Sequence, residues 1–145
     1  MARSRSGGKH NHYNDIGFAR GKLSPSKAIA AIREMGEHVL EAAKTELKKG
    51  ADAVVADAKN RCPVKTGRLR DSIKAESNRD GSVYWITANA SVESKKSPSG
   101  RFYYGAVVEF SPNNNRPFLY PAMEANRQQI EDNISAAISK AARSV

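Results

Sequence analysis

The sequence predicts an α+β fold, in which a long N-terminal amphipathic helix and a C-terminal helix pack on a small antiparallel β-sheet of about three to four strands. Apolar residues recur three and four positions apart in residues 26–61 and again after residue 117. Between them lie short segments rich in β-branched and aromatic residues, separated by turn residues. We expect a basic arm in residues 1–24 and a single domain in residues 25–145.

The first helix has a start signal at Ser24-Pro25-Ser26 and a stop at Pro63, whose ring fixes φ and lacks an N–H. A helix from Ser26 to Arg61 would be about 54 Å long. A small sheet cannot cover that length. We therefore expect part of its apolar stripe to be buried against another subunit or another helix, unless the helix breaks near Gly50. Gly36 and Gly50 could each mark a bend or a close helix contact. The stripe comprises Ile29, Ile32, Met35, Val39, Leu40, Ala43, Leu47, Ala51, Val54, Val55, Ala58 and Cys62.

A hinge follows, from Arg61 to Ile73, in which Thr66-Gly67 offers a turn before an expected first strand, Leu69–Ser77. The hinge is cationic, because residues 59–74 hold six Lys or Arg against one Asp. The candidates for contact with a subunit or with DNA are Arg61, Lys65, Arg68 and Arg70.

The next segments alternate between strand and loop. Asn78–Gly81 predicts a turn, and Ser82–Ala88 predicts a strand. The polar stretch 89–101 is either a flexible hairpin loop or a finger that touches a neighbour or nucleic acid through Lys95 and Lys96. In the apolar segment 102–110, Gly105 permits a close backbone approach or a short helical turn. Tyr104, Val107, Val108 and Phe110 are expected in the core, and Pro117 in the first turn of the last helix. The apolar stripe of that helix comprises Phe118, Leu119, Ala122, Met123, Ile130, Ile134, Ala137, Ile138 and Ala141.

A net charge of +9 favours an acidic partner such as nucleic acid. The arm contributes five cations against Asp15 and cannot bury enough apolar surface to fold alone. It either orders on a partner or remains a solvated tail. Its candidate binding residues are Arg3, Arg5, Lys9, Arg20 and Lys22.

Few residues are suited to catalysis, cofactor binding or metal binding. The single cysteine, Cys62, excludes an internal disulfide and is expected to be a small packed residue. His10 and His12 have no third metal ligand nearby, and His38 lies in a charged helix. Phosphate-loop, dinucleotide and His-Glu-x-x-His motifs are absent. We expect no catalytic residue, cofactor or metal. We also expect no membrane partner, because no apolar run approaches the ~20 residues of a span.

Three separated motifs carry a resemblance to a known family. They are Cys62-Pro63-Val64-Lys65-Thr66-Gly67-Arg68-Leu69-Arg70-Asp71-Ser72-Ile73, Tyr104-Gly105-Ala106-Val107-Val108-Glu109-Phe110 and Arg116-Pro117-Phe118-Leu119-Tyr120-Pro121-Ala122. In order and residue type the chain resembles the gene-product-ten-like tail components of tailed bacteriophages, also described as neck, tail-completion or head–tail joining proteins. It departs from the family pattern at Cys62 and Gly105, where the family has Ala, at Lys65, where it has Asp, and at Ser111, where it has Gly.

The resemblance implies a structural virion protein of the head–tail junction, made in the host cytoplasm. Such a protein would form a homo-oligomeric ring, with a hexamer favoured, between head-completion or connector proteins and the tail tube or tail terminator. Genome DNA would pass through the ring. The hinge cations would then line this channel or bridge acidic surfaces of neighbouring subunits. The family-motif positions with a structural role would be Pro63, Thr66, Gly67, Leu69, Ser72, Tyr104, Glu109, Phe110, Pro117, Phe118, Leu119 and Pro121.

A different class of function stays open from the sequence. The chain could be a stand-alone nucleic-acid-binding module that uses the arm, the hinge and a stacking surface made by Tyr84 and Trp85. Against this hypothesis, no Arg or Lys adjoins Trp85 in its strand. An enzyme is a weaker third option, because catalytic groups are scarce.

Overall fold

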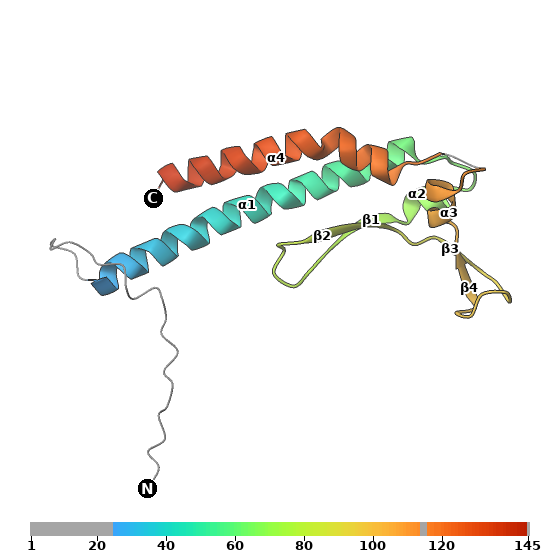
Figure 1. The fold of residues 1–145 in the computed structure, drawn as a ribbon, viewed down its shortest axis with the longest axis horizontal. Coiled ribbons are helices and arrows are strands. Elements are labelled where there is room, and N and C mark those ends of the chain that lie inside the picture. Colours follow the sequence, from blue (N-terminus) through green and yellow to red (C-terminus); the bar gives the residue numbers. More distant parts are fainter. Residues whose placement is uncertain (1–24, 114–115, 145) are drawn as a thin grey trace, which may run out of the picture. The chain divides into compact units, whose positions relative to one another are not determined.

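The computed structural model describes residues 25–113 and 116–144, and the expected arm lies outside them. The described residues fall into two units, divided between Glu34 and Met35. The predicted α+β class is confirmed, with a long first helix, a long last helix and short antiparallel strands between them (Figure 1). The elements are α1 (Pro25–Arg61), α2 (Arg68–Asp71), β1 (Ile73–Ser77), β2 (Tyr84–Ala88), β3 (Ser91–Glu93), β4 (Arg101–Tyr103), α3 (Gly105–Phe110) and α4 (Leu119–Arg143).

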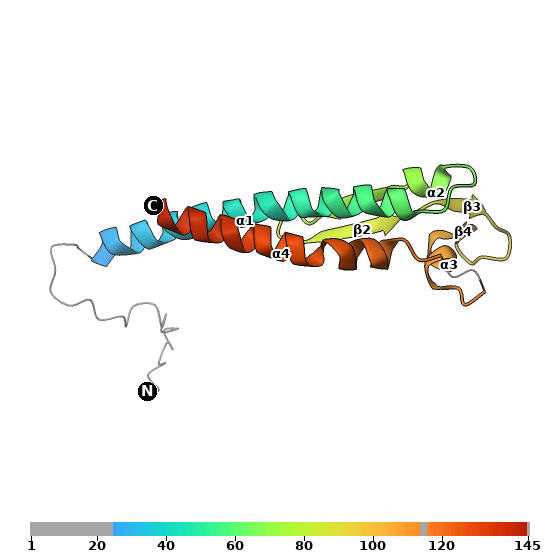
Figure 2. The ribbon, with the colours of Figure 1, turned by 90° about the horizontal axis from the view of Figure 1, so that it is seen from above.

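Within the second unit, helix α4 lies antiparallel along residues 35–61 of α1 (Figures 1 and 2). The Asn126 amide donates to Asp57 Oδ2 at 2.9 Å, and His38 Nε2 lies 3.3 Å from Ser144 Oγ. Between these contacts, a Cβ placed on Gly50 would lie only 2.8 Å from Cγ1 of Ile130. Gly50 thus marks a close contact between the helices, and α1 continues through it without a break. Gly36 has no such contact within 4 Å.

Within residues 25–113 and 116–144 four strands form, in line with the three to four expected, but they make two separate antiparallel pairs instead of one sheet. In the first pair, Ile73 lies opposite Ala88 and Ser77 opposite Tyr84. The second pair joins β3, in the stretch expected to be a loop or finger, to β4, which extends from its end into the apolar segment, with Val92 opposite Phe102. A hairpin this small is marginally stable alone, so it depends on its surroundings.

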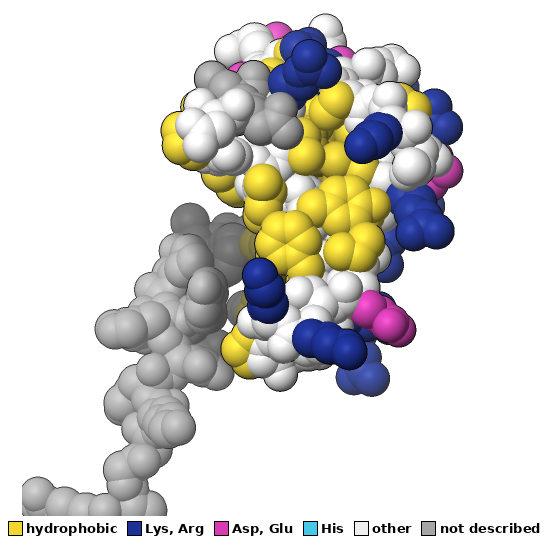
Figure 3. Space-filling view, turned by 90° about the vertical axis from the view of Figure 1, so that its right-hand side faces the viewer, with side chains coloured by type: hydrophobic (Ala, Val, Ile, Leu, Met, Phe, Trp, Pro, Cys, Tyr) yellow, Lys and Arg dark blue, Asp and Glu magenta, His cyan; other side chains and the backbone are white. Residues whose placement is uncertain are grey.

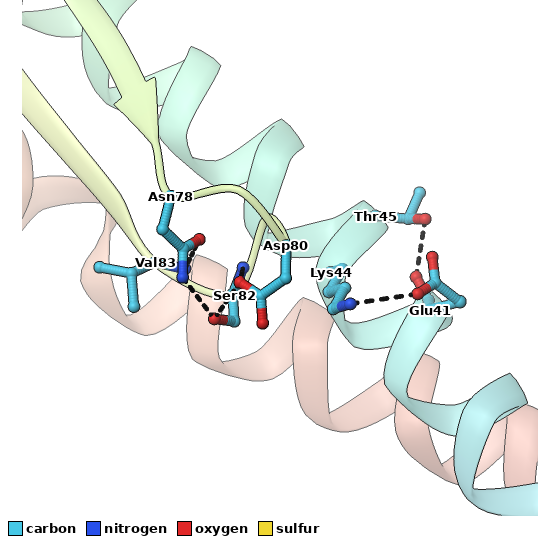
Figure 4. A network of polar contacts seen from close by, with 7 residues as sticks. All are labelled: Glu41, Lys44, Thr45, Asn78, Asp80, Ser82 and Val83. Carbon is cyan, nitrogen blue, oxygen red and sulfur yellow. Dashed lines mark hydrogen bonds and ion pairs between the residues drawn. The ribbon is translucent and has the colours of Figure 1, made fainter.

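The predicted turn at residues 78–81 forms and is held by its own side chains (Figure 4). Asp80 Oδ1 accepts hydrogen bonds from Ser82 Oγ at 2.7 Å and from Ser82 N at 3.2 Å. These bonds lower the pKa of Asp80, and the charge of Lys44 lowers it further. Lys44 pairs in turn with Glu41 at 3.2 Å, so the tip of the hairpin lies beside the middle of α1.

Three expected boundaries are wrong, and the simplest case is the strand expected over Ser82–Ala88, which begins only at Tyr84. Leu69 to Ser72 are not strand, because Gly67 turns the chain with φ +82° and Ser72 Oγ donates to Leu69 O at 2.7 Å, which closes the short helix α2. The first strand therefore begins at Ile73. Pro117 lies outside the last helix, which begins at Leu119. Pro121 occupies its first turn instead, where a missing N–H is tolerated.

The core lies where the second half of α1 meets α2, β1 and the start of α4. Phe118, Ile73 and Val54 are its largest fully buried side chains. Tyr104 and Val108 pack against this core as expected. Val107 and Phe110 do not, since the buried face of α3 is formed by Gly105 and Glu109, and Phe110 is 78% exposed.

The first half of the α1 stripe has a different environment. Met35 is 39% exposed and Leu40 is 50% exposed, whereas Ala51, Val54, Ala58 and Cys62 are buried. Ile29 and Ile32 are also exposed. The packing of α4 on α1 thus realises one expected alternative, burial against another helix, for the later part of the stripe. The exposed Met35 and Leu40 leave room for the other alternative, burial against another subunit.

Candidate functional site

The three sequence motifs meet at one place, which we call the motif junction. Leu69 and Ile73 from the first motif, Tyr104 and Val108 from the second, and Phe118 from the third belong to or pack on the same core cluster. The cluster also contains Cys62 and Ala122. Motifs separated by 30 residues (74–103) and 5 residues (111–115) in sequence are thus parts of one structural unit.

Glu109 is the central polar group of the motif junction. It is 5% exposed, and its carboxylate accepts three backbone hydrogen bonds from the N-terminus of α4. Oε2 lies 2.7 Å from the amide nitrogen of Phe118 and 3.0 Å from that of Leu119, and Oε1 lies 2.7 Å from that of Tyr120. A helix N-terminus leaves N–H groups unpaired and carries partial positive charge, so a buried carboxylate is stabilised there. Glu109 therefore fixes α3 to the start of α4.

Ser72 and Gly105 join the other segments. Ser72 Oγ donates to Leu69 O and accepts from the amide of Ala90 at 3.1 Å, which links α2 to the segment after β2. Gly105 lies so close to β2 that a Cβ there would be 2.6 Å from the carbonyl oxygen of Ala88. Both alternatives expected for Gly105, a close approach and a helical turn, are therefore realised together.

The structure tolerates two other departures from the family pattern, Ser111 and Lys65, without strain. Ser111 has φ −70° and ψ 125°, an extended conformation that any residue adopts, so glycine is not needed there. Lys65 is exposed on the turn, and Thr66 Oγ1 lies 3.5 Å from the amide of Arg68. The turn thus forms without a carboxylate at position 65.

Cys62 is buried, as expected for a packed residue. Burial raises the pKa of its thiol above the ordinary value of 9.0, the charge of Arg70 opposes this shift, and Glu109 adds to it. A thiol with a raised pKa is a poor nucleophile at neutral pH. The chemistry of Cys62 is therefore that of a core residue.

A pocket of about 560 Å³ opens beside the motif junction, and we call it the hinge pocket. Its apolar walls include Val64, Leu69, Val92, Tyr104 and Val108. Three cations line it as well: Lys65, Arg68 and Arg116. Figure 3 shows this end of the molecule, where hydrophobic side chains gather between Lys and Arg side chains.

The four hinge cations are not equivalent. Arg61 pairs with Asp57 at 2.9 Å, and Arg70 pairs with Asp71 at 3.2 Å. Within the described part of the chain, no ion pair involves Lys65, Arg68 or Arg116. Sequence reasoning missed Arg116, because no local pattern places a residue from the third motif beside the first.

The remaining candidates lie apart from the hinge pocket or outside the described residues. Lys95 and Lys96 are exposed in the loop between β3 and β4, where Ser94 N donates to Gly100 O at 3.0 Å. The arm cations Arg3, Arg5, Lys9, Arg20 and Lys22 belong to residues that the structure does not describe.

Tyr84 and Trp85 do not form the single stacking surface considered from the sequence. They are consecutive in β2, so their side chains point to opposite faces. Tyr84 is partly buried and lines a groove between α1, β2 and α4, whereas Trp85 is exposed and lies opposite Glu76. Glu76 is itself paired with Lys74 at 2.6 Å.

Two further observations concern the described residues. Among residues 25–113 and 116–144, no group of three or more His, Cys, Asp or Glu side chains could hold a metal ion. In the same ranges, no helix combines the length and the apolar character that a membrane crossing requires.

A family described as "Bacteriophage HK97-gp10, putative tail-component" matches residues 26–110, more than half of the chain. This range contains the first and second motifs and ends before the third. No curated protein and no solved structure matches the chain. Two of the three motifs that meet at the motif junction lie in the matched range. The chain belongs to the HK97-gp10-like family of bacteriophage tail components.

Proposed function

We propose that this protein is a structural component of the phage head–tail junction. Several copies, with six favoured, form a ring that joins head-completion or connector proteins to the tail tube or tail terminator. Membership of a tail-component family supports a role in the virion, in contact with other phage structural proteins. The ring and its position between head and tail are the parts of the proposal that go beyond membership of this family.

One observation supports this function most: within the described residues, several large apolar side chains remain exposed outside the core, and two groups of them are relevant here. They are the first half of the α1 stripe, with Met35 and Leu40, and the hinge end, with Val64, Val92 and Phe102. Exposed apolar surface bordered by polar residues is typical of protein–protein contact sites. The hydrogen bonds of the motif junction, by contrast, are made within one chain and hold its segments together.

The positive charge of the chain suits a ring around DNA. In this proposal Lys95, Lys96 and the arm of residues 1–24 face the channel or a neighbouring virion protein. The domain of residues 25–145 builds the ring. The ring would contact DNA only because it surrounds the channel, and it would not need to recognise a base sequence.

The test is the mass and shape of the purified full chain. We expect closed rings by light scattering and negative-stain electron microscopy, and co-elution with the connector or tail-terminator protein of the same phage. A monodisperse monomer with no affinity for either partner would contradict the proposal. A filter-binding titration at two salt concentrations separates it from the nucleic-acid-binding module, which predicts tight, steeply salt-dependent DNA binding by the monomer.

A further inference from the structure

We infer that the hinge pocket of one copy receives the first half of α1, residues Met35–Ala43, from a second copy. The inference rests on the proposed ring and names the two surfaces that build it. It also assigns Lys65 and Arg68 to a contact between subunits instead of a DNA channel.

The hinge pocket is suited to an apolar side chain flanked by carboxylates. Val64, Leu69 and Val92 provide apolar walls, and the volume of about 560 Å³ exceeds that of one side chain. Lys65, Arg68 and Arg116 border these walls and make no ion pair with described residues. Phe102, which pairs across the hairpin with Val92, extends the apolar surface beyond the pocket. The partner is therefore expected to be acidic and amphipathic.

Residues 35–43 of α1 have this character. Leu40 is an exposed apolar side chain, and Glu37 lies three residues before it on the same face of the helix, whereas the exposed Met35 lies on a different face. Between Met35 and Ala43 there is no Lys or Arg. Glu41 forms an ion pair with Lys44, whose side chain is largely buried. The negative charge available to a partner therefore lies mainly at Glu37. The charge of this segment is opposite to that of the hinge pocket.

The same copy cannot supply both surfaces to one contact. Met35 and Arg61 lie in one unbroken helix and are separated by about 39 Å at 1.5 Å per residue. The hinge pocket lies beyond Arg61, where Val64 and Lys65 line it. A second copy must therefore provide the helix. Because the two surfaces differ, the contact is heterologous, and such contacts generate a ring when the rotation closes.

Charge reversal tests the pairing in the full-length protein. Lys65→Glu with Arg68→Glu makes the pocket acidic, and Glu37→Lys with Glu41→Lys makes the helix basic. Each double variant alone places like charges at the contact, so we expect its association to weaken at least about tenfold. When the two are mixed in equal amounts, every contact between unlike copies regains opposite charges. We expect native mass spectrometry to show rings that contain equal numbers of the two variants, as alternation requires.

Lys48→Glu with Arg79→Glu is the matched control, since both residues are exposed, neither lines the hinge pocket, and no ion pair within the described residues involves either of them. It makes the same charge change and should assemble like the wild type. Circular dichroism melts check that all variants fold. If the wild type forms rings and both double variants also do, or if mixing fails to restore association, the inference is wrong and the proposed function stands. Loss of DNA binding with intact rings in Lys65→Glu/Arg68→Glu would likewise overturn it. A wild type that forms no ring contradicts the proposed function itself.

Discussion

Helix α1 has the same spacing of apolar residues in both halves, but the two halves have different neighbours. From Gly50 to Cys62 the stripe packs against α4 and the motif junction, and Val54 and Ala58 are buried. Around Met35 and Leu40 the same stripe is open. Amphipathic spacing therefore predicts that a helix face will be covered, but it does not identify the covering element. We assign the second half to folding and the first half to assembly.

The largest effect is expected inside the motif junction. Phe118→Ala removes a side chain that is 0% exposed, and the loss of apolar burial plus the cavity should cost about 3–5 kcal/mol. The free energy of unfolding in urea, at one fixed protein concentration, measures this. A loss below about 1 kcal/mol would show that the junction is not the folding core.

Glu109→Ala should cost somewhat less, about 2–4 kcal/mol, because it leaves three N–H groups at the start of α4 without their acceptor. Glu109→Gln keeps the shape and one acceptor oxygen, so it should lose about half as much. The free energies of unfolding of both variants in urea, compared with that of the wild type, test this prediction. Equal stability of wild type and Glu109→Ala would rule out the capping role.

Cys62 gives a prediction that depends on pH. Because burial raises the pKa of its thiol in the folded state, the thiol's contribution to stability is fully present below pH 9.0 and is lost as pH rises through the native pKa. A thiol reagent at pH 8 should react at least about tenfold more slowly with native than with urea-unfolded protein. Equal rates would mean that Cys62 is accessible and the junction open.

The smallest effect on stability is expected in the open half of α1. Leu40→Ser should change the free energy of unfolding of the dissociated chain by no more than about 0.5 kcal/mol, since the side chain is half exposed. It should nevertheless weaken association, measured by light scattering over a dilution series. Trp85→Ser is the control, because it removes another exposed apolar side chain without touching either proposed surface. If both variants assemble alike, Leu40 has no part in assembly.

The sequence predicted the elements that depend on local chemistry. The turns at Gly67 and Gly81 and the end of α1 before Pro63 follow from backbone geometry, and both glycines have positive φ. The two long helices follow from the spacing of their apolar residues. Short elements were harder to predict, because α2 depends on Gly67 and on a hydrogen bond made by Ser72, and β3 is only three residues long.

The site could be predicted only in part. The motifs identified Glu109 as structural, but its role depends on contacts nine to eleven residues further along the chain. Arg116 lies beside the hinge cations in the folded chain, although it is far from them in sequence. Arg61 and Arg70 form ion pairs with aspartates, which the sequence did not predict. Phe110 was expected in the core because it is apolar, but the helix α3 turns it outward.

Hydrogen–deuterium exchange of the full chain at low and high concentration tests the division of α1 most directly. Amides in residues 50–62 should exchange slowly at both concentrations, because the core protects them in each copy. Amides in residues 35–43 and at the hinge pocket should become protected only where the chain assembles. Protection of residues 35–43 that does not change with assembly, or fast exchange of residues 50–62 in the assembled protein, would contradict the account.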